Sequence, residues 1–194
     1  MDVFDSRALT HPDGYYHHFT AVGMYKWGFY QKGDFQIQVT APPSGYTAVQ
    51  HDIEVAFAGG EFLIHDGNKS LTVIEGDHVL WRLATNDPGA PSMVIAGDND
   101  DTKNWDTLYN QRMDAEDAFS HLFQSIGTHN YVVSENGAVT QVGEVQVTAG
   151  AVGKPEVVTL TTGSPPNPAK AVVTLQTTVI WDVDSGKDVA VYSL

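Results

Sequence analysis

The chain uses two of its segments twice, and this internal repeat limits its fold more than any other feature. "LTVIEGDHVLW" (71–81) aligns with "AVVTLQTTVIW" (171–181), and "YYHHFTAVGMYKW" (15–27) aligns with "FSHLFQSIGTHNY" (119–131). "FQIQVT" (35–40) and "GEVQVT" (143–148) follow the second pair in both places. A segment that recurs with its apolar positions kept is one structural unit used twice. Trp81 and Trp181 match in this alignment, and we expect them to anchor equivalent cores.

The order of the repeated segments predicts how the domains are laid out. A back half comes first, a complete unit follows over residues 51–149, and a front half comes last. The predicted second domain is therefore split, or circularly permuted, and consists of residues 150–194 together with 1–50. An isolated half would expose an apolar sheet face and unpaired strand edges. We expect the split domain to be completed either in cis or by a neighbouring subunit.

Short runs rich in Val, Ile, Thr and aromatic residues, bounded by Gly, Pro, Asn and Asp, predict strands along the chain. Such runs are "FQIQVT" (35–40), "IEVAF" (53–57), "HVLWRL" (78–83), "EVQVT" (144–148), "VVTL" (157–160) and "TVIWDV" (178–183). The regularly recurring turn signals favour antiparallel sandwiches over alternating βαβ units. The predicted fold class is all-β, with two Greek-key β-sandwich domains. Only residues 102–119 are expected to hold a helical turn or two.

Taken in order, these motifs resemble the cupredoxins of the plastocyanin and halocyanin kind. In that family a front half like "GDHVLW" (76–81) leads to a first histidine, and a back half like "FSHLFQSIGTHNY" (119–131) leads to a ligand loop. The resemblance covers nearly the whole chain if the split copy is included. It implies a Greek-key sandwich with a blue copper centre at one end. Copper is held there by a thiolate, two imidazoles and a weak thioether.

The chain departs from the family at every position that the resemblance assigns to copper. In the complete unit, the cysteine, second histidine, methionine and first histidine positions hold Val133, Asn136, Gln141 and, on or beside it, Ser92. In the split copy, Phe29 holds the cysteine position and Asp188 lies near the first histidine. The chain also has no cysteine, so no thiolate can be a ligand. We therefore expect no type 1 copper and no other cofactor, and we expect the loop over residues 127–147 to persist as a connection within the sandwich.

Histidine is the remaining class of metal ligand, but the histidines lack the spacing of a zinc site. His17 and His18 are adjacent, so on a strand they point to opposite faces and cannot chelate together. His17 and His121 follow the same alternation as the aromatic residues beside them, which indicates packed and hydrogen-bonded side chains. His65 and His78 are expected to be exposed near strand ends.

An acidic segment over residues 96–107 places Asp98, Asp100 and Asp101 close together. Clustered carboxylates are the ligands that Ca²⁺ prefers, but the spacing is not that of an EF-hand. We expect a solvated acidic loop, with a weak calcium site as the alternative.

Composition excludes some partners. The net charge of −14, without a basic cluster, would repel a phosphate backbone, so nucleic acid is not an expected partner. No apolar run is long enough to span a bilayer, and the start of the chain does not have the pattern of a signal peptide. No nucleophile elbow or phosphate-binding loop is present, so an enzyme is not expected.

We expect a non-catalytic structural protein outside the cytoplasm or at the cell surface. Its subunits would associate head to tail by strand or half-domain complementation, as a filament or another surface assembly. One alternative is a monomeric small-ligand binding module at the former copper end. Another is a copper or zinc protein that uses histidines the family does not use.

Overall fold

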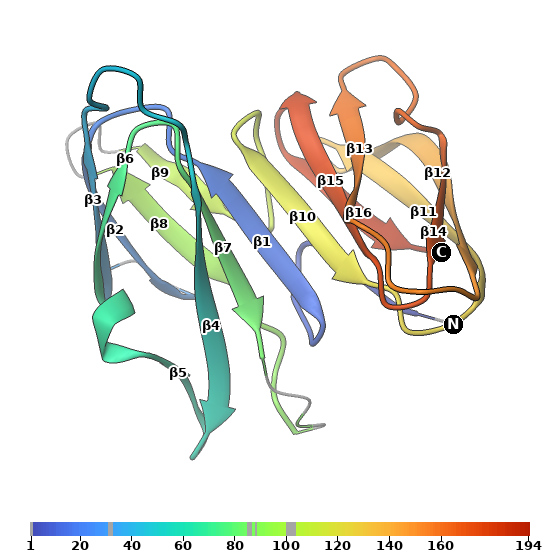
Figure 1. Cartoon of the computed structure of the whole chain (residues 1–194), viewed down its shortest axis with the longest axis horizontal. Coiled ribbons are helices and arrows are strands. Elements are labelled where there is room, and N and C mark those ends of the chain that lie inside the picture. The colour runs from blue at the N-terminus through green and yellow to red at the C-terminus, as the bar shows by residue number, and fades with distance from the viewer. Residues whose placement is uncertain (1, 31–32, 85–86, 88, 100–103) are drawn as a thin grey trace.

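The computed structural model describes residues 2–30, 33–84, 87, 89–99 and 104–194, and within these ranges the chain is built from strands and one short 3-10 turn (Figure 1). The first strands are β1 (Asp13–His18), β2 (Gly23–Phe29), β3 (Phe35–Thr40), β4 (Gln50–Ala58), β5 (Glu61–Ile64), β6 (Ser70–Ile74), β7 (His78–Leu83), β8 (Ile95–Asn99) and β9 (Asn104–Tyr109). The remaining strands are β10 (Asp117–Leu122), β11 (Gly127–Glu135), β12 (Ala138–Thr148), β13 (Glu156–Thr161), β14 (Lys170–Thr174), β15 (Thr178–Ser185) and β16 (Val189–Ser193). The 3-10 turn spans Asp66–Asn68. The all-β prediction is confirmed.

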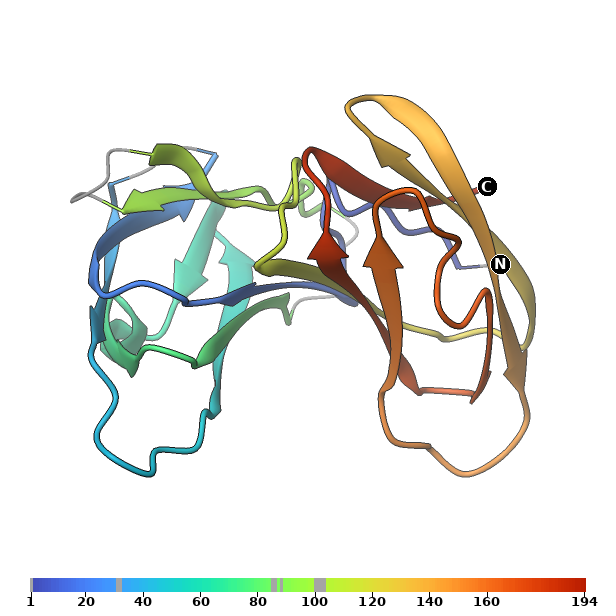
Figure 2. The ribbon, with the colours of Figure 1, turned by 90° about the horizontal axis from the view of Figure 1, so that it is seen from above.

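Two sandwiches share one long sheet. The shared sheet has seven strands in the order β13-β15-β10-β1-β7-β4-β5. A five-stranded sheet, β6-β3-β2-β8-β9, belongs to sandwich 1, and a four-stranded sheet, β14-β12-β11-β16, belongs to sandwich 2. Both smaller sheets lie on the same side of the shared sheet (Figure 2). The seam between the sandwiches is the antiparallel pair β1–β10.

The two sandwiches are built from equivalent strand pairs. In sandwich 1, Tyr15 of β1 pairs with Trp81 of β7, and in sandwich 2 Phe119 of β10 pairs with Trp181 of β15. The parallel pairs β3–β6 and β12–β14 also correspond, and β2–β8 corresponds to β11–β16. Trp81 and Trp181 are fully buried, as predicted from the repeat. The sequence repeat is therefore also a repeat of the three-dimensional packing.

The beginning of the chain packs in sandwich 2. The Ser193 N–H donates to the Phe4 carbonyl (2.9 Å), and the Ser6 N–H donates to the Val191 carbonyl (2.9 Å). Phe4 is buried and stacks on Trp181, with ring centroids 5.1 Å apart. This segment lies beside β16 as β9 lies beside β8, although it forms only an isolated bridge, between Asp5 and Tyr192, and not a strand. Each sandwich therefore has a segment at this place.

The strand pairing divides the chain differently from the expected 51–149 and 150–194 plus 1–50 boundaries. β4 to β9 pair with β1 to β3, which precede them, rather than with β10 to β12. β13 to β16 likewise pair with β10 to β12, and every described strand finds its partner within one chain. The physical reason is that both back halves offer equivalent strands, so the repeat alone does not say which back half a front half takes.

The linker over residues 41–49 is anchored to sandwich 1 by a buried carboxylate. Asp77 accepts hydrogen bonds from the Tyr46 hydroxyl (2.5 Å) and the Val49 N–H (2.9 Å), and His51 Nε2 lies 2.9 Å from its other oxygen. The Ile74 N–H also donates to Asp77 (2.9 Å). This clamp holds the end of β3 close to the start of β4, which favours the pairing of neighbouring halves.

The expected helical turns in residues 102–119 are not found in the described part of that segment. Residues 104–109 form β9, and β10 begins at Asp117. The reason is tertiary, because both segments complete ladders beside β8 and β1. No described helix is long and apolar enough to cross a membrane.

Candidate functional site

The seam between the sandwiches brings the buried polar side chains of the two repeats together. Tyr15 lies opposite Phe119 in the β1–β10 ladder, and these two residues are equivalent in the sequence repeat. An antiparallel ladder centred on equivalent residues relates the two strands by an approximate two-fold axis. Residues on either side of this centre therefore meet their counterparts from the other repeat.

Two equivalent aspartate–histidine pairs cross the seam. His121 Nδ1 lies 2.6 Å from Asp13 Oδ1, and His17 Nδ1 lies 2.7 Å from Asp117 Oδ1. Each pair joins one strand of sandwich 1 to one strand of sandwich 2. All four side chains are at most 4% exposed. A buried charged group is tolerated when it is paired and hydrogen-bonded, and both carboxylates meet this condition.

The carboxylates of Asp13 and Asp117 also accept hydrogen bonds from backbone N–H groups and hydroxyls. The Thr10 N–H donates to Asp13 Oδ2 (3.0 Å), and the Asp114 N–H donates to Asp117 Oδ2 (2.9 Å). Tyr15 adds a hydroxyl that donates to Asp117 Oδ1 (2.5 Å). Burial raises the pKa of Asp13, opposed by its hydrogen bond with His121. Burial, followed by the neighbouring Asp117 carboxylate, raises the pKa of Tyr15 well above its ordinary value.

The sequence contained a signal for these pairs. Both repeats have an aspartate four residues before a histidine, in "DGYYH" (13–17) and "DAFSH" (117–121). On a strand, residues four apart share a face, and an antiparallel partner reverses their order. The packed, hydrogen-bonded character predicted for His17 and His121 is confirmed. Their partners were missed because the β1–β10 register could not be read from either strand alone.

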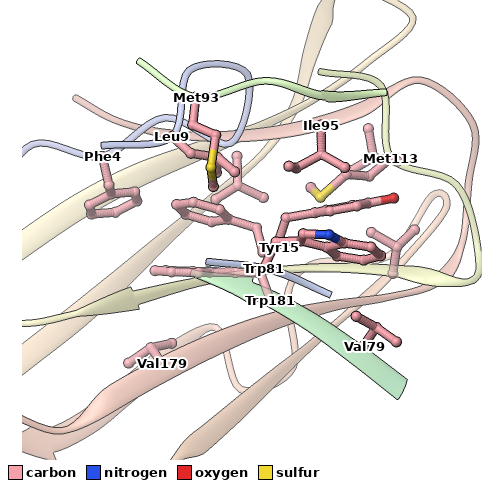
Figure 3. Close-up of a cluster of buried hydrophobic side chains, with 14 of the residues drawn as sticks. Phe4, Leu9, Tyr15, Val79, Trp81, Met93, Ile95, Met113, Val179 and Trp181 are labelled. Carbon is pink, nitrogen blue, oxygen red and sulfur yellow. The ribbon is translucent and has the colours of Figure 1, made fainter. Parts of the chain in front are cut away.

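The cores of the two sandwiches are continuous beneath the seam (Figure 3). Leu9 and Met93 exchange backbone hydrogen bonds (3.1 and 2.7 Å), and Met113 does the same with Val189 (3.0 and 2.9 Å). Leu9, Met93 and Met113 are fully buried. The seam is therefore packed on its inner side, by the described residues of both sandwiches.

The positions that the cupredoxin resemblance assigns to copper ligands are divided between the sandwiches. Val133, Asn136 and Gln141 lie in sandwich 2, where the Asn136 N–H donates to the carbonyl of Asp188 (3.2 Å). Val133 is fully buried and pairs with Gln141 across the β11–β12 hairpin. Asn136 has a φ of 51°, and Gly137 follows with 77°. Two left-handed residues in sequence are the geometry of a tight hairpin turn, so the expected loop is a hairpin connection.

In sandwich 1, Ser92 lies with Phe29 rather than with Val133. The Tyr30 hydroxyl donates to the Ser92 carbonyl. Phe29 contacts Phe35 and Phe62, with ring centroids 5.8 and 5.0 Å away. The position that the resemblance assigns to the thiolate ligand is therefore part of an aromatic cluster.

A hollow of about 390 Å³ lies beside Gln141, lined also by Thr140, Val142 and residues 163–166. Gln141 Nε2 donates to the Thr161 carbonyl (3.1 Å). Ser92 does not line this hollow, so the set of residues proposed from sequence for a small ligand is not assembled in one place.

The acidic segment differs from the solvated loop that was expected. Asp98 is buried (1% exposed) within β8, opposite Lys26 of β2. Asp100 and Asp101 lie outside the described residues. Strand pairing accounts for the burial of Asp98, because β8 lies between β2 and β9.

His65 and His78 are exposed, as predicted. His65 is exposed and accepts a hydrogen bond from the Gly67 N–H (3.2 Å). His78 is exposed at the start of β7. Within the residues that the structure describes, no group of three or more metal-ligating side chains could hold a metal ion.

Comparison of the chain with family models, curated proteins and solved structures found no match.

Proposed function

We propose that this chain is a non-catalytic structural protein. In this proposal it has two cupredoxin-like sandwiches without copper, and it assembles head to tail by exchanging equivalent halves between chains. The observation that carries the proposal is the equivalence of the two interfaces between front and back halves. Gln38 of β3 pairs with Thr72 of β6, and the equivalent Gln146 of β12 pairs with Val172 of β14. Tyr15–Trp81 and Phe119–Trp181 repeat the same correspondence in the shared sheet.

Equivalent interfaces allow a front half to accept either back half. In the exchanged arrangement, β4 to β9 pair with β10 to β12 of the same chain, which is the unit expected over residues 51–149. The front half β13 to β16 then receives β1 to β3 of the next chain. Domain exchange of this kind uses contacts that the closed chain already makes, so its cost is low. The contact is heterologous and propagates unless the subunits close into a ring.

The buried polar groups support a structural role. Asp13, His17, Asp117 and His121 pair with one another inside the seam and fix the register of β1 against β10. Buried polar pairs can select one register among several similar ones. A protein whose two repeats are nearly equivalent needs groups that favour one register of β1 against β10 over similar ones.

Engineered cysteines test the exchange directly, since the natural chain has no cysteine. In the closed chain, position 38 in β3 and position 172 in β14 belong to different sandwiches. In the exchanged arrangement they become neighbours on adjacent chains. The variant Gln38→Cys/Val172→Cys should therefore give a ladder of linked chains on a denaturing gel after treatment with a short bismaleimide.

The control is Gln38→Cys/Thr72→Cys, which should link within one chain when the chain is closed. Sedimentation of the natural chain gives the independent measurement. If it runs as a compact 21.1 kDa particle at every concentration and the first variant gives no ladder, the assembly proposal is wrong.

A further inference from the structure

The outer face of the shared sheet carries polar side chains that take no part in the aspartate–histidine pairs of the seam. The two smaller sheets cover only the other face (Figure 2). On the outer face, Tyr16, Leu80 and Ser120 line a hollow of about 310 Å³ that reaches into both sandwiches. His18 lies two residues from Tyr16, and His78 lies two residues from Leu80, so both histidines share this face.

His18 and His78 form a closely spaced cross-strand pair. They lie opposite each other in the β1–β7 ladder. The His18 N–H donates to the Glu116 carbonyl (2.8 Å) and the His78 N–H donates to the Val49 carbonyl (3.0 Å), so the two residues do not bond each other. Side chains approach most closely at such non-hydrogen-bonded positions. Their rings are stacked, with centroids 4.4 Å apart and an interplanar angle of 7°.

The charged groups near this pair include a carboxylate from the other sandwich. Burial, followed by the nearby His18, lowers the pKa of His78, while Asp182 and Asp77 oppose this shift. Burial, followed by Asp184, raises the pKa of Asp182, while His78 and His18 lower it. Asp182 of β15 therefore interacts with both rings from the other sandwich. Neutral imidazole is the form that binds a metal ion, and the nearby negative charge attracts a cation.

We propose that His18 and His78 bind one divalent transition-metal ion of the kind that prefers imidazole, with water completing the coordination and Asp182 providing nearby negative charge. Two nitrogens at about 2.0–2.1 Å from a tetrahedral ion lie about 3.3 Å apart with their lone pairs converging on it. The two rings, now nearly parallel, therefore have to rotate about their side-chain torsions until one nitrogen of each points at the same ion. A site with two protein ligands is exchangeable and weaker than a closed structural site. It also lies on a different face from the former copper positions.

Copper(II) is the probe, because it binds imidazole more tightly than other divalent first-row ions. Titration of the natural chain at pH 7.5, followed by electron paramagnetic resonance, should show one bound ion with two nitrogen ligands. The solution should lack an intense blue band, since no thiolate is present. His18→Ala and His78→Ala should each weaken binding at least about tenfold, because loss of a direct ligand costs no less than loss of a supporting residue.

His65→Ala is the matched control, because it removes an exposed histidine outside this pair and should leave binding unchanged. Circular dichroism and thermal unfolding of each variant establish that it is folded. Zinc(II) titration followed through the imidazole proton resonances provides a second measurement. The proposal is overturned if the natural chain binds neither ion, or if both single variants bind them as the natural chain does.

Discussion

Trp81 and Trp181 hold equivalent places in the two cores. Each is fully buried, and each packs on an aromatic residue of the seam, Tyr15 at 5.6 Å or Phe119 at 5.5 Å between ring centroids. Replacing either tryptophan by alanine should lower the free energy of unfolding by about 3–5 kcal/mol, because the cavity cannot collapse fully. Denaturant unfolding measures this loss. A change of a few tenths of a kcal/mol in either variant would contradict the equivalence of the two cores.

Asp77 should make the free energy of unfolding depend on pH. Thr177, its equivalent in the sequence repeat, has no ionisable side chain and cannot do so. Burial alone would raise the pKa of Asp77, but donors from Tyr46, Val49, Ile74 and His51 hold it well below the ordinary value. The same hydrogen bond raises the pKa of Tyr46 to about 12. Because the folded pKa is depressed, the stabilisation is present above the unfolded pKa of about 3.9 and is lost as pH falls through the folded value.

Asp77→Asn should therefore lower the free energy of unfolding at pH 7 by about 1.5–3 kcal/mol, as expected for hydrogen bonds to a charged group. Below about pH 4 the difference between the natural chain and the variant should shrink. Denaturant unfolding at a series of pH values measures the effect. A difference that stays constant from pH 7 to pH 2 would show that the charge of Asp77 does not contribute.

The burial of single residues could be predicted from the sequence where the in-and-out alternation of a strand determines it. The two tryptophans are buried where the strand period places them, and His17 and His121 are packed and hydrogen-bonded. Asp98 was expected in a loop because it begins an acidic run, yet it is buried in a strand. Composition alone does not reveal a neighbouring strand, so local polarity was a poor guide there.

At the scale of elements, the seam between β1 and β10 depends on its aspartate–histidine pairs. His121→Ala should lower the free energy of unfolding by about 3–5 kcal/mol, because it leaves the buried Asp13 carboxylate without its partner. Asp13→Ala and the double variant complete a double-mutant cycle, whose coupling energy should be about 1–3 kcal/mol. Denaturant unfolding of the four proteins gives this value. Additivity within about 0.5 kcal/mol would mean that the pair does not act as a unit.

The elements themselves were largely readable, but their grouping was not. The runs over 35–40, 53–57, 78–83, 144–148, 157–160 and 178–183 all fall within or on observed strands. The boundary predicted at residue 51 came from grouping the front half that starts there with the back half that follows it along the chain. Because β3 meets β6 as β12 meets β14, either grouping satisfies the same pattern of apolar residues. Linker anchoring by Asp77, which depends on tertiary contacts, distinguishes the two groupings in the closed chain.

At the scale of the whole molecule, the proposed metal site and the proposed assembly should oppose each other. In the closed chain, His18 faces His78, and the equivalent position across the seam pairs Leu122 with Thr178. Exchange of halves would place Leu122 opposite His78 and His18 opposite Thr178. The exchanged form therefore loses the two-histidine pair, and a ligand shifts an equilibrium toward the state that it binds more tightly.

Zinc(II) should consequently favour the closed chain. At a free concentration ten times the dissociation constant, it would stabilise that form by about 1.4 kcal/mol, which is about a tenfold shift in the equilibrium. Sedimentation velocity of the natural chain should show smaller particles with zinc(II) than with a chelator. His18→Ala should assemble to the same extent in both conditions, which separates this effect from nonspecific screening of the −14 net charge. Larger particles with zinc(II) that also require His18 would instead indicate that the metal joins two chains, and would contradict the opposition derived from strand pairing.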